Sequence, residues 1–408
     1  MFKRAIYKEI WDELAADKAM VFISGARQAG KTVFAREIIA GEFKNNVYFN
    51  WDIIRDKKKL IEDPAFFQKV NRRDNSAPLV IFDEIHKYKN WKNYLKGVYD
   101  EFSKEYQFLV SGSGRLDIYQ KGGDSLAGRY LQMHLFPFTI AELSAKRRAF
   151  ADFIKNPIEG FDLNPAKATS GLWDALFELG GFPEPFIKGK KTFWNKWSQA
   201  YAKQILQEDI RSVIDLKNVD TVEILFSLVP SKTGSPLSIN NIAQDLRVAF
   251  ETVKNWLTIF ERFYLVFRIS PWTNKVSRAI TKEKKAYLFN YPLIQEEGAR
   301  FENMVALELL RAVYNWNERG YGRFSLHYIR NKEKTEVDFV ITDNNRPFLL
   351  AETKLSDEEP AKSLLNFQSV FNIPAVQFVN KEGIFKYIRN GSNKALIVTA
   401  HRWLSCLP

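Results

Sequence analysis

The chain has 408 residues, more than a single hydrophobic core normally supports, so we expect several domains. Hydrophobic residues make up 46% of the chain and aromatic residues 14%, a composition that excludes an intrinsically disordered protein. The formal net charge is +12. This charge favours a polyanionic partner such as nucleic acid, and a basic surface without such a partner stays open as the alternative.

Targeting and redox signals point to the cytoplasm. The sequence has no run of about 18 apolar residues, so we expect no membrane-spanning helix. The first twenty residues contain acids and no continuous apolar stretch, which is unlike a secretory signal. Cys406 is the single cysteine, and no intrachain disulfide can form. The four histidines lie far apart in the sequence, without the spacing of zinc ligands.

A glycine-rich loop follows the first predicted strand, residues 20–24, and precedes a predicted helix, residues 32–40. Its glycines permit backbone conformations that direct N–H groups at phosphate oxygens. Its lysine is expected to reach the β- and γ-phosphates of ATP, and its threonine hydroxyl to bind Mg²⁺. The strand–loop–helix context predicts a P-loop for ATP with magnesium. The loop reads Gly25, Ala26, Arg27, Gln28, Ala29, Gly30, Lys31, Thr32.

A second apolar run, residues 78–82, ends in Asp83 and Glu84. A strand here delivers carboxylates to the edge of the sheet where the P-loop lies. We predict that Asp83 holds the magnesium ion and that Glu84 orients and polarises the attacking water. A further strand predicted at residues 46–51 lies between the two motifs. Together with the Asp-Glu pair, it favours the hydrolytic P-loop proteins over the nucleotide kinases.

Two further residues are candidates for catalysis. A strand predicted at residues 107–110 runs into a serine–glycine turn, where Ser113 is our candidate for sensing the γ-phosphate. An ordinary turn is the alternative. Arg129 is a candidate arginine finger, with a surface arginine as the alternative. A finger acting in trans would require a homo-oligomer.

The middle of the chain predicts a helical lid and a helix-turn-helix. Residues 172–179 and 193–214 have helical periodicity, and residues 237–248 and 251–257 have helix-turn-helix spacing. Arg247 stands where such turns usually have glycine, which carries a penalty if its φ is positive. A strand predicted at residues 264–269 and a basic flank at residues 274–285 complete a winged helix. It either binds duplex DNA or has only a structural role, and the acidic Glu251 and Glu261 weaken the first interpretation.

The C-terminal part predicts a helix at residues 301–310 and a hairpin of residues 336–341 and 348–354. A three-residue loop would place Asp338 opposite Leu350 and put Glu352 and Lys354 on the face of Asp338. Asp338 and Glu352 would then be close enough to share a divalent ion. A two-residue loop would instead place the two acids on opposite faces and remove the site.

Several segments together resemble prokaryotic AAA-type ATPases that carry an uncharacterised C-terminal domain. The resemblance implies an ATP-hydrolysing α/β core with a doubly wound parallel sheet (residues 1–165), a helical lid (166–230), a winged helix (231–285) and a domain of the restriction-endonuclease fold (286–408). The matching segments are residues 25–32, 79–87, 108–116, 126–143, 180–186, 336–340 and 352–354.

The same resemblance assigns the C-terminal acids to a metal-dependent nuclease motif. In that motif Asp338 and Glu352 bind Mg²⁺, Lys354 polarises or stabilises, and Glu302 is the third acid. Asn290 occupies a place where the family often has aspartate, so a role for an acid there is in doubt. The alternative is a domain that keeps the fold and binds without cleaving.

Three functions follow from these motifs. The first is an AAA-type ATPase that acts on or is regulated by nucleic acid, DNA before RNA. The second is a nuclease gated by the ATPase. The third is a regulatory switch whose ATP state exposes a surface for a protein partner.

Overall fold

The structure, a computed structural model, describes residues 2–112, 126–144, 147–161, 167–212, 219–274 and 282–408. The chain divides into two compact units. The first comprises Met1–Pro137 with Arg262–Tyr264, and the second comprises Phe138–Glu261 with Leu265–Pro408. The division into four domains expected from the sequence is finer than this and stays a prediction. Within the described ranges, no helix is both long enough and apolar enough to cross a bilayer.

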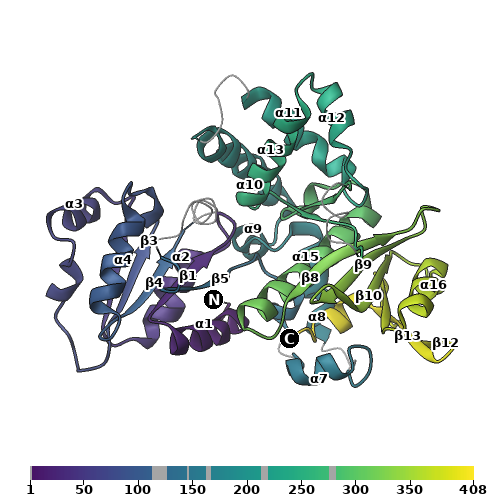
Figure 1. Cartoon of the computed structure of the whole chain (residues 1–408), viewed down its shortest axis with the longest axis horizontal. Coiled ribbons are helices and arrows are strands. Elements are labelled where there is room, and N and C mark those ends of the chain that lie inside the picture. The colour runs from purple at the N-terminus through teal and green to yellow at the C-terminus, as the bar shows by residue number, and fades with distance from the viewer. Residues whose placement is uncertain (1, 113–125, 145–146, 162–166, 213–218, 275–281) are drawn as a thin grey trace. The chain divides into compact units, whose positions relative to one another are not determined.

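The first unit is built on a five-stranded parallel sheet with the order β2-β3-β4-β1-β5 (Figure 1). The α/β class predicted from the sequence is therefore confirmed. The strand β4 lies between β1, which leads into the P-loop, and β3, which carries Asp83. The strands are β1 (Met20–Ser24), β2 (Asn46–Asn50), β3 (Leu79–Asp83), β4 (Gln107–Ser111) and β5 (Leu131–His134).

Helices cover this sheet because its strands are apolar on both faces. Phe22, Phe82 and Phe108 share one face and pack with α4 in a large aromatic core. The helix α1 contacts β1 and β5. The helical segments are α1 (Ala5–Asp17), α2 (Lys31–Val33), its continuation in the π-turn η1 (Phe34–Ile39) and in η2 (Ala40–Glu42), α3 (Ile54–Glu62), η3 (Phe66–Lys69), η4 (Ile85–Lys87) and α4 (Trp91–Phe102).

The second unit begins with a helical part. The stretches predicted as helices, residues 172–179 and 193–214, fall largely within helical segments. The segments are α6 (Ile140–Leu143), α7 (Phe150–Lys155), α8 (Lys167–Leu179), α9 (Pro183–Lys188), α10 (Lys191–Gln204), η5 (Ile205–Asp209), η6 (Ile210–Ser212), α11 (Val219–Leu228) and η8 (Val229–Lys232).

Two helices and a two-stranded sheet occupy the predicted winged-helix region. The helices α12 (Ile239–Asp245) and α13 (Phe250–Arg262) are joined through Arg247, whose φ is 55°, so the strained backbone expected there is present. The strands β6 (Val266–Ile269) and β7 (Lys285–Leu288) pair antiparallel. The interpretation of this region as a winged helix stays a prediction.

A six-stranded mixed sheet forms the C-terminal part, with the order β12-β13-β11-β10-β9-β8 (Figure 1). Val340 and Leu350 on one face pack with Leu364 of α16, and α15 contacts β8, β9 and β10. The elements are η9 (Tyr291–Leu293), α15 (Glu297–Glu318), β8 (Phe324–Arg330), β9 (Glu336–Asp343), β10 (Arg346–Lys354), α16 (Lys362–Phe371), β11 (Ala375–Val379), β12 (Phe385–Asn390), β13 (Asn393–Thr399) and α17 (Ala400–Leu404).

The register of the β9–β10 hairpin differs from the predicted one. Asp343 pairs with Arg346, so the loop has two residues, Asn344 and Asn345, both with positive φ. A bulge between Pro347 and Leu349 then shifts the register so that Leu350 pairs with Val340. The predicted placement of Asp338 opposite Leu350 is therefore wrong. The observed register differs from the predicted one because Asn344 and Asn345 adopt the left-handed conformation of a tight two-residue turn.

Two glycines of the first unit give a matched test of this fold. Gly25 has a φ of 148°, and a Cβ there would lie 2.2 Å from the Leu135 carbonyl oxygen. Gly97 lies within α4, where a Cβ would meet nothing within 4 Å. We expect Gly25→Ala to destabilise the first unit and Gly97→Ala to stabilise it by up to about 1 kcal/mol, measured by urea unfolding. Equal effects of the two substitutions would contradict the close approach at Gly25.

Candidate functional site

The P-loop lies at the carboxyl end of β1. Gly25 and Gly30 both have positive φ, 148° and 95°, so the loop needs glycine at these two positions. The side chain of Arg4 supports the loop from the segment that precedes α1. Its guanidinium donates to the carbonyl oxygen of Ala29 at 2.9 Å and to that of Phe136 at 2.5 Å. Arg4 is therefore a positioning residue that fixes the loop relative to the end of β5.

The ammonium of Lys31 is directed into its own loop. It donates to the carbonyl oxygens of Gly25 at 2.9 Å and Ala26 at 2.7 Å, and the residue is 8% exposed. These two carbonyls lie where the loop would surround an anion. Phosphate oxygens would replace them as acceptors, because a charged acceptor forms the stronger hydrogen bond with an ammonium.

Asp83 is the centre of the polar contacts beside the P-loop. Its carboxylate, which is almost fully buried, accepts three hydroxyl hydrogen bonds. The donors are Thr32 at 2.9 Å, Tyr48 at 2.8 Å and Ser111 at 2.6 Å. Burial and the nearby charge of Asp83 raise the pKa of Tyr48, so this phenol stays protonated as a donor. Thr32 and Asp83 are thus adjacent oxygen donors of the kind that Mg²⁺ prefers.

Sequence reasoning missed Tyr48 and Ser111. Ser111 ends β4, directly beside Asp83 in the strand register, and the position of β4 between β1 and β3 brings it to the site. Its place at the end of an apolar strand was the available signal. Ser113, the residue that the sequence suggested for sensing the γ-phosphate, lies outside the described residues.

Glu84 is adjacent to Asp83 but is held by an ion pair. Its φ of 55° turns the chain after β3, and its carboxylate lies 3.1 Å from the ammonium of Lys87. Lys87 also pairs with Asp52 at 2.6 Å. Burial lowers the pKa of Lys87, but the two carboxylates outweigh burial and raise it above its ordinary value. Glu84, the residue predicted to orient the attacking water, therefore lies next to Asp83 and forms an ion pair with Lys87 of the same unit.

Arg129 does not reach the P-loop of its own chain. It precedes β5, whose Leu131 pairs with Val21 early in β1, whereas the P-loop follows the other end of β1. Its guanidinium makes a bidentate pair with Asp100 of α4, at 2.6 and 3.1 Å. The sheet thus places Arg129 and the P-loop at opposite ends of parallel strands. A finger supplied by a second copy stays a prediction.

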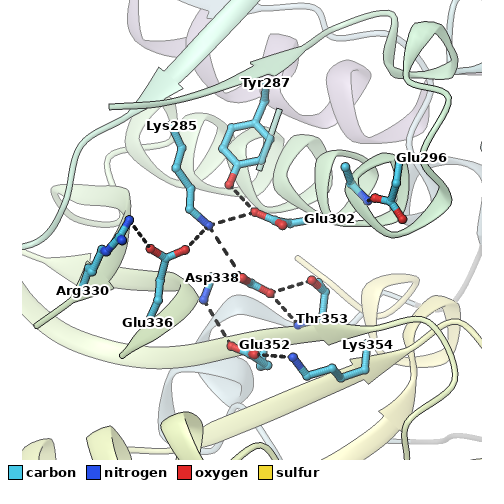
Figure 2. A network of polar contacts seen from close by, with 11 residues as sticks. Lys285, Tyr287, Glu296, Glu302, Arg330, Glu336, Asp338, Glu352, Thr353 and Lys354 are labelled. Atoms are coloured by element: carbon cyan, nitrogen blue, oxygen red, sulfur yellow. Dashed lines mark hydrogen bonds and ion pairs between the residues drawn. The ribbon is translucent and has the colours of Figure 1, made fainter. Parts of the chain in front are cut away.

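The second unit contains a cluster of carboxylates around one buried lysine (Figure 2). The ammonium of Lys285, on β7, lies 3.1 Å from Glu302 of α15 and 2.7 Å from Glu336 of β9. Asp338 is the third carboxylate, at 3.7 Å. Lys285 is 1% exposed. Burial lowers its pKa, but the charges of the three acids outweigh burial and raise it above its ordinary value.

Two carboxylates of this cluster also accept hydrogen bonds from neighbouring residues. The hydroxyl of Tyr287 donates to Glu302 at 2.7 Å. Asp338 accepts from the backbone N–H and the hydroxyl of Thr353, at 2.9 and 2.6 Å. Burial, with a contribution from the charge of Asp338, raises the pKa of Glu302 to about 8.

Glu352 does not join Glu302 and Asp338. Its carboxylate pairs with Lys354 at 2.8 Å and accepts from the backbone N–H of Asp338 at 3.3 Å (Figure 2). By strand alternation Glu352 lies on the face of Leu350, whereas the side chain of Asp338 turns to Thr353 and Lys285. The two side chains differ in direction because of a second β-bulge. Between the pairs His327–Val340 and Ile329–Val337, β9 has one more residue than β8.

The predicted second metal site is not formed in this arrangement. Glu302 and Asp338 pair with Lys285, whereas Glu352 pairs with Lys354. In the ranges that the structure describes, no group of three or more histidine, cysteine, aspartate or glutamate side chains is arranged to hold a metal ion. In this arrangement the ammonium of Lys285 is the common partner of Glu302, Glu336 and Asp338.

Three family models match successive parts of the chain. Residues 17–144 match a model described as an AAA domain. Residues 171–295 and 297–399 match two models that are each described as a domain of unknown function, DUF8612 and DUF4143. The match to the AAA domain covers the sheet, the P-loop and the contacts of Asp83.

Similar proteins occur in archaea and bacteria. The uncharacterized protein MJ1544 of Methanocaldococcus jannaschii is 22% identical, with 99% of this chain and 90% of that protein aligned. The uncharacterized protein Rv2008c of Mycobacterium tuberculosis is 22% identical over 81% of this chain and 69% of that protein.

Solved structures that align with part of this chain include the Walker-type ATPase PABY2304 of Pyrococcus abyssi, at 12% identity and a TM-score of 0.45, with 74% of this chain and 96% of that one covered. The ORC1 protein of Aeropyrum pernix in complex with DNA has 12% identity and a TM-score of 0.33, with 74% and 93% covered. Likenesses at this level carry no argument about function. The similarity of residues 17–144 to AAA domains rests on the family model.

Removing the hydroxyl donors of Asp83 tests the geometry of this site. Tyr48→Phe and Ser111→Ala each delete one hydrogen bond to a buried carboxylate, so we expect each to lower the free energy of unfolding of the first unit by about 1.5–3 kcal/mol. Urea unfolding followed by circular dichroism would measure the loss. Tyr99→Phe on α4 is the control, since Tyr99 is outside this set of contacts, and a loss of the same size there would contradict the assignment.

Proposed function

We propose that this protein is an AAA-type ATPase that hydrolyses ATP with Mg²⁺ at the P-loop of its first unit. The observation that carries the proposal is the 2.9 Å hydrogen bond between Thr32 and Asp83. P-loop ATPases hold the magnesium ion of the bound nucleotide with a P-loop Ser/Thr and an aspartate at the end of a neighbouring strand. The similarity of residues 17–144 to AAA domains supports the same assignment.

Each residue has a role in this mechanism. The backbone N–H groups of residues 25–32 hold the phosphates, and Lys31 moves from its loop carbonyls to the β- and γ-phosphates. Thr32 and Asp83 would hold Mg²⁺, which would supply positive charge against the phosphoryl oxygens. Ser111 keeps Asp83 oriented. Glu84 orients the attacking water and accepts its proton.

Substitution of Lys31 and Glu84 separates nucleotide binding from hydrolysis. We expect Lys31→Ala to lose both, because the loop then lacks its phosphate-binding cation. We expect Glu84→Gln to bind ATP as the unmodified protein does and to hydrolyse it at least about 100-fold more slowly. Calorimetric titration with ATP·Mg²⁺ and a phosphate-release assay measure the two steps. Hydrolysis at an unchanged rate in Glu84→Gln would refute the role given to Glu84.

The ion pair of Glu84 with Lys87 predicts a restrained basal rate. Lys87→Met removes the cation that holds the carboxylate at 3.1 Å, so we expect faster hydrolysis without any partner, by about threefold to tenfold for an interaction of about 1 kcal/mol. Lys89→Met is the matched control, an exposed lysine two residues further along the chain. A slower rate in Lys87→Met would show that Lys87 assists catalysis.

We further propose that nucleic acid, DNA before RNA, stimulates this ATPase. The net charge of +12 supports the proposal. The helix α13 adds little to it, because Lys254 pairs with Glu251 at 3.1 Å and Arg268 of β6 pairs with Glu261. A polyanion is therefore expected to bind through the basic surface as a whole and not through base contacts of α13.

Hydrolysis measured with and without single- and double-stranded DNA and RNA tests this second proposal. We expect a faster rate with DNA that is lost as salt rises from about 50 to 200 mM, because phosphate contacts release counterions. Lys31→Ala is the control for contaminating ATPases. A rate that no nucleic acid changes would favour a switch that acts on a protein partner.

A further inference from the structure

The carboxylate cluster of the second unit has no vacant centre. Three acidic side chains, from α15 and β9, lie within 3.7 Å of the single ammonium of Lys285. A divalent ion shared by these acids would need the same position. Lys285 is 1% exposed, and its ammonium lies 5.5 Å from the centre of the Tyr328 ring, so it is buried within the cluster.

Each of the three acids also has a partner besides Lys285. Glu302 accepts from Tyr287, Asp338 accepts twice from Thr353, and Glu336 lies 3.6 Å from the guanidinium of Arg330 (Figure 2). Each carboxylate thus has a proton donor or a second cation in addition to Lys285. A metal ion would have to displace these partners and would gain few free oxygen atoms.

The chain also closes over the cluster from a second side. Gly234 has a φ of 79°, and a Cβ there would lie 2.9 Å from Oε2 of Glu302. Pro236 forms a β-bridge with Lys285, and the N–H of Leu237 donates to the carbonyl of Lys284 at 2.9 Å. Residues 234–237 therefore run directly along Lys285 and Glu302.

We propose that Lys285 is the built-in cation of this cluster and takes the position that a nuclease-type metal ion would need, so that the second unit holds its acids together without metal and does not cleave nucleic acid. Lys285 binds β7 to α15 and β9, and its ammonium joins three elements that are distant in the sequence. The cluster is a closed structural centre of the second unit. This proposal is independent of ATP hydrolysis at the P-loop.

Substitution of Lys285 in the full chain tests the proposal. Lys285→Met leaves three acids without their shared cation, so we expect the melting temperature to fall by on the order of 10 °C. Millimolar Mn²⁺, added without nucleotide, is expected to restore part of this loss in Lys285→Met. The control Lys284→Met changes the neighbouring, partly exposed lysine and is expected to melt and to respond to Mn²⁺ as the unmodified protein does.

A second variant covers the case in which Lys285→Met does not fold. In Lys285→Met with Glu336→Gln, one negative charge is removed with the cation, so we expect a higher melting temperature than for Lys285→Met alone. The unmodified protein provides an independent measurement. Mn²⁺ is expected not to raise the melting temperature of the unmodified protein through Asp338. The unmodified protein is also expected not to cleave single- or double-stranded DNA or RNA.

Three outcomes would overturn the proposal. One is a Mn²⁺-dependent stabilisation of the unmodified protein that Asp338→Asn removes. Another is cleavage of nucleic acid with Mn²⁺ that Asp338→Asn and Glu352→Gln abolish. The third is a melting temperature of Lys285→Met equal to that of Lys284→Met, which would show that the ammonium does not hold the acids. ATP hydrolysis is expected to persist in Lys285→Met, so failure here is distinguishable from failure of the ATPase assignment.

Discussion

A buried carboxylate that must be satisfied by hydrogen bonds organises the first unit. Leaving the charge of Asp83 buried without partners would be costly, and three hydroxyls prevent this. Thr32 comes from the P-loop helix, Tyr48 from β2 and Ser111 from β4, so one side chain fixes three elements relative to β3. The parallel sheet makes this convergence inevitable, because all its strands end at the same edge. The nucleotide site is thus a consequence of how one acid is buried.

The second unit meets the same physical problem with a different solution. Its acids lie on a helix and on a strand with an extra residue, and hydroxyls of Tyr287 and Thr353 donate to two of them. A lysine ammonium from β7 supplies a full positive charge at the centre. An aspartate with neutral donors can still bind a magnesium ion, because the ion supplies the positive charge that the hydroxyls lack. A carboxylate with an internal ammonium has its counter-charge already, which explains why these two acidic sites are suited to different roles.

The two halves of the molecule also differ in how far the sequence predicts them. The strand–loop–helix of the P-loop and the acids after β3 are local patterns, and the structure has both where they were expected. The contacts of Tyr48, Ser111 and Arg129 depend on strand order, which no local pattern contains. In the C-terminal hairpin the predicted pairing of Asp338 with Leu350 was wrong because the strand register differs. The turn Asn344–Asn345 and two bulges decide which face each acid takes, and one residue of slip moves a side chain across the sheet. No local sequence pattern predicts the contacts of Lys285, because its ammonium joins elements that are far apart in the sequence.

The two reactive side chains of the ATPase site are restrained in different ways. Lys31 is bound to carbonyls of its own loop, and phosphate oxygens compete for it directly, so binding of the nucleotide itself releases this restraint. Glu84 is bound to Lys87, which is in turn bound to Asp52. In the proposed ATPase mechanism, binding and hydrolysis are therefore controlled separately: the nucleotide is sufficient for binding, while hydrolysis depends on a loosening of the pair of Lys87 with Glu84. A polyanion that attracts Lys87 away from Glu84 would connect the basic charge of the chain to the rate of hydrolysis by an electrostatic competition and would require no contact with the nucleotide.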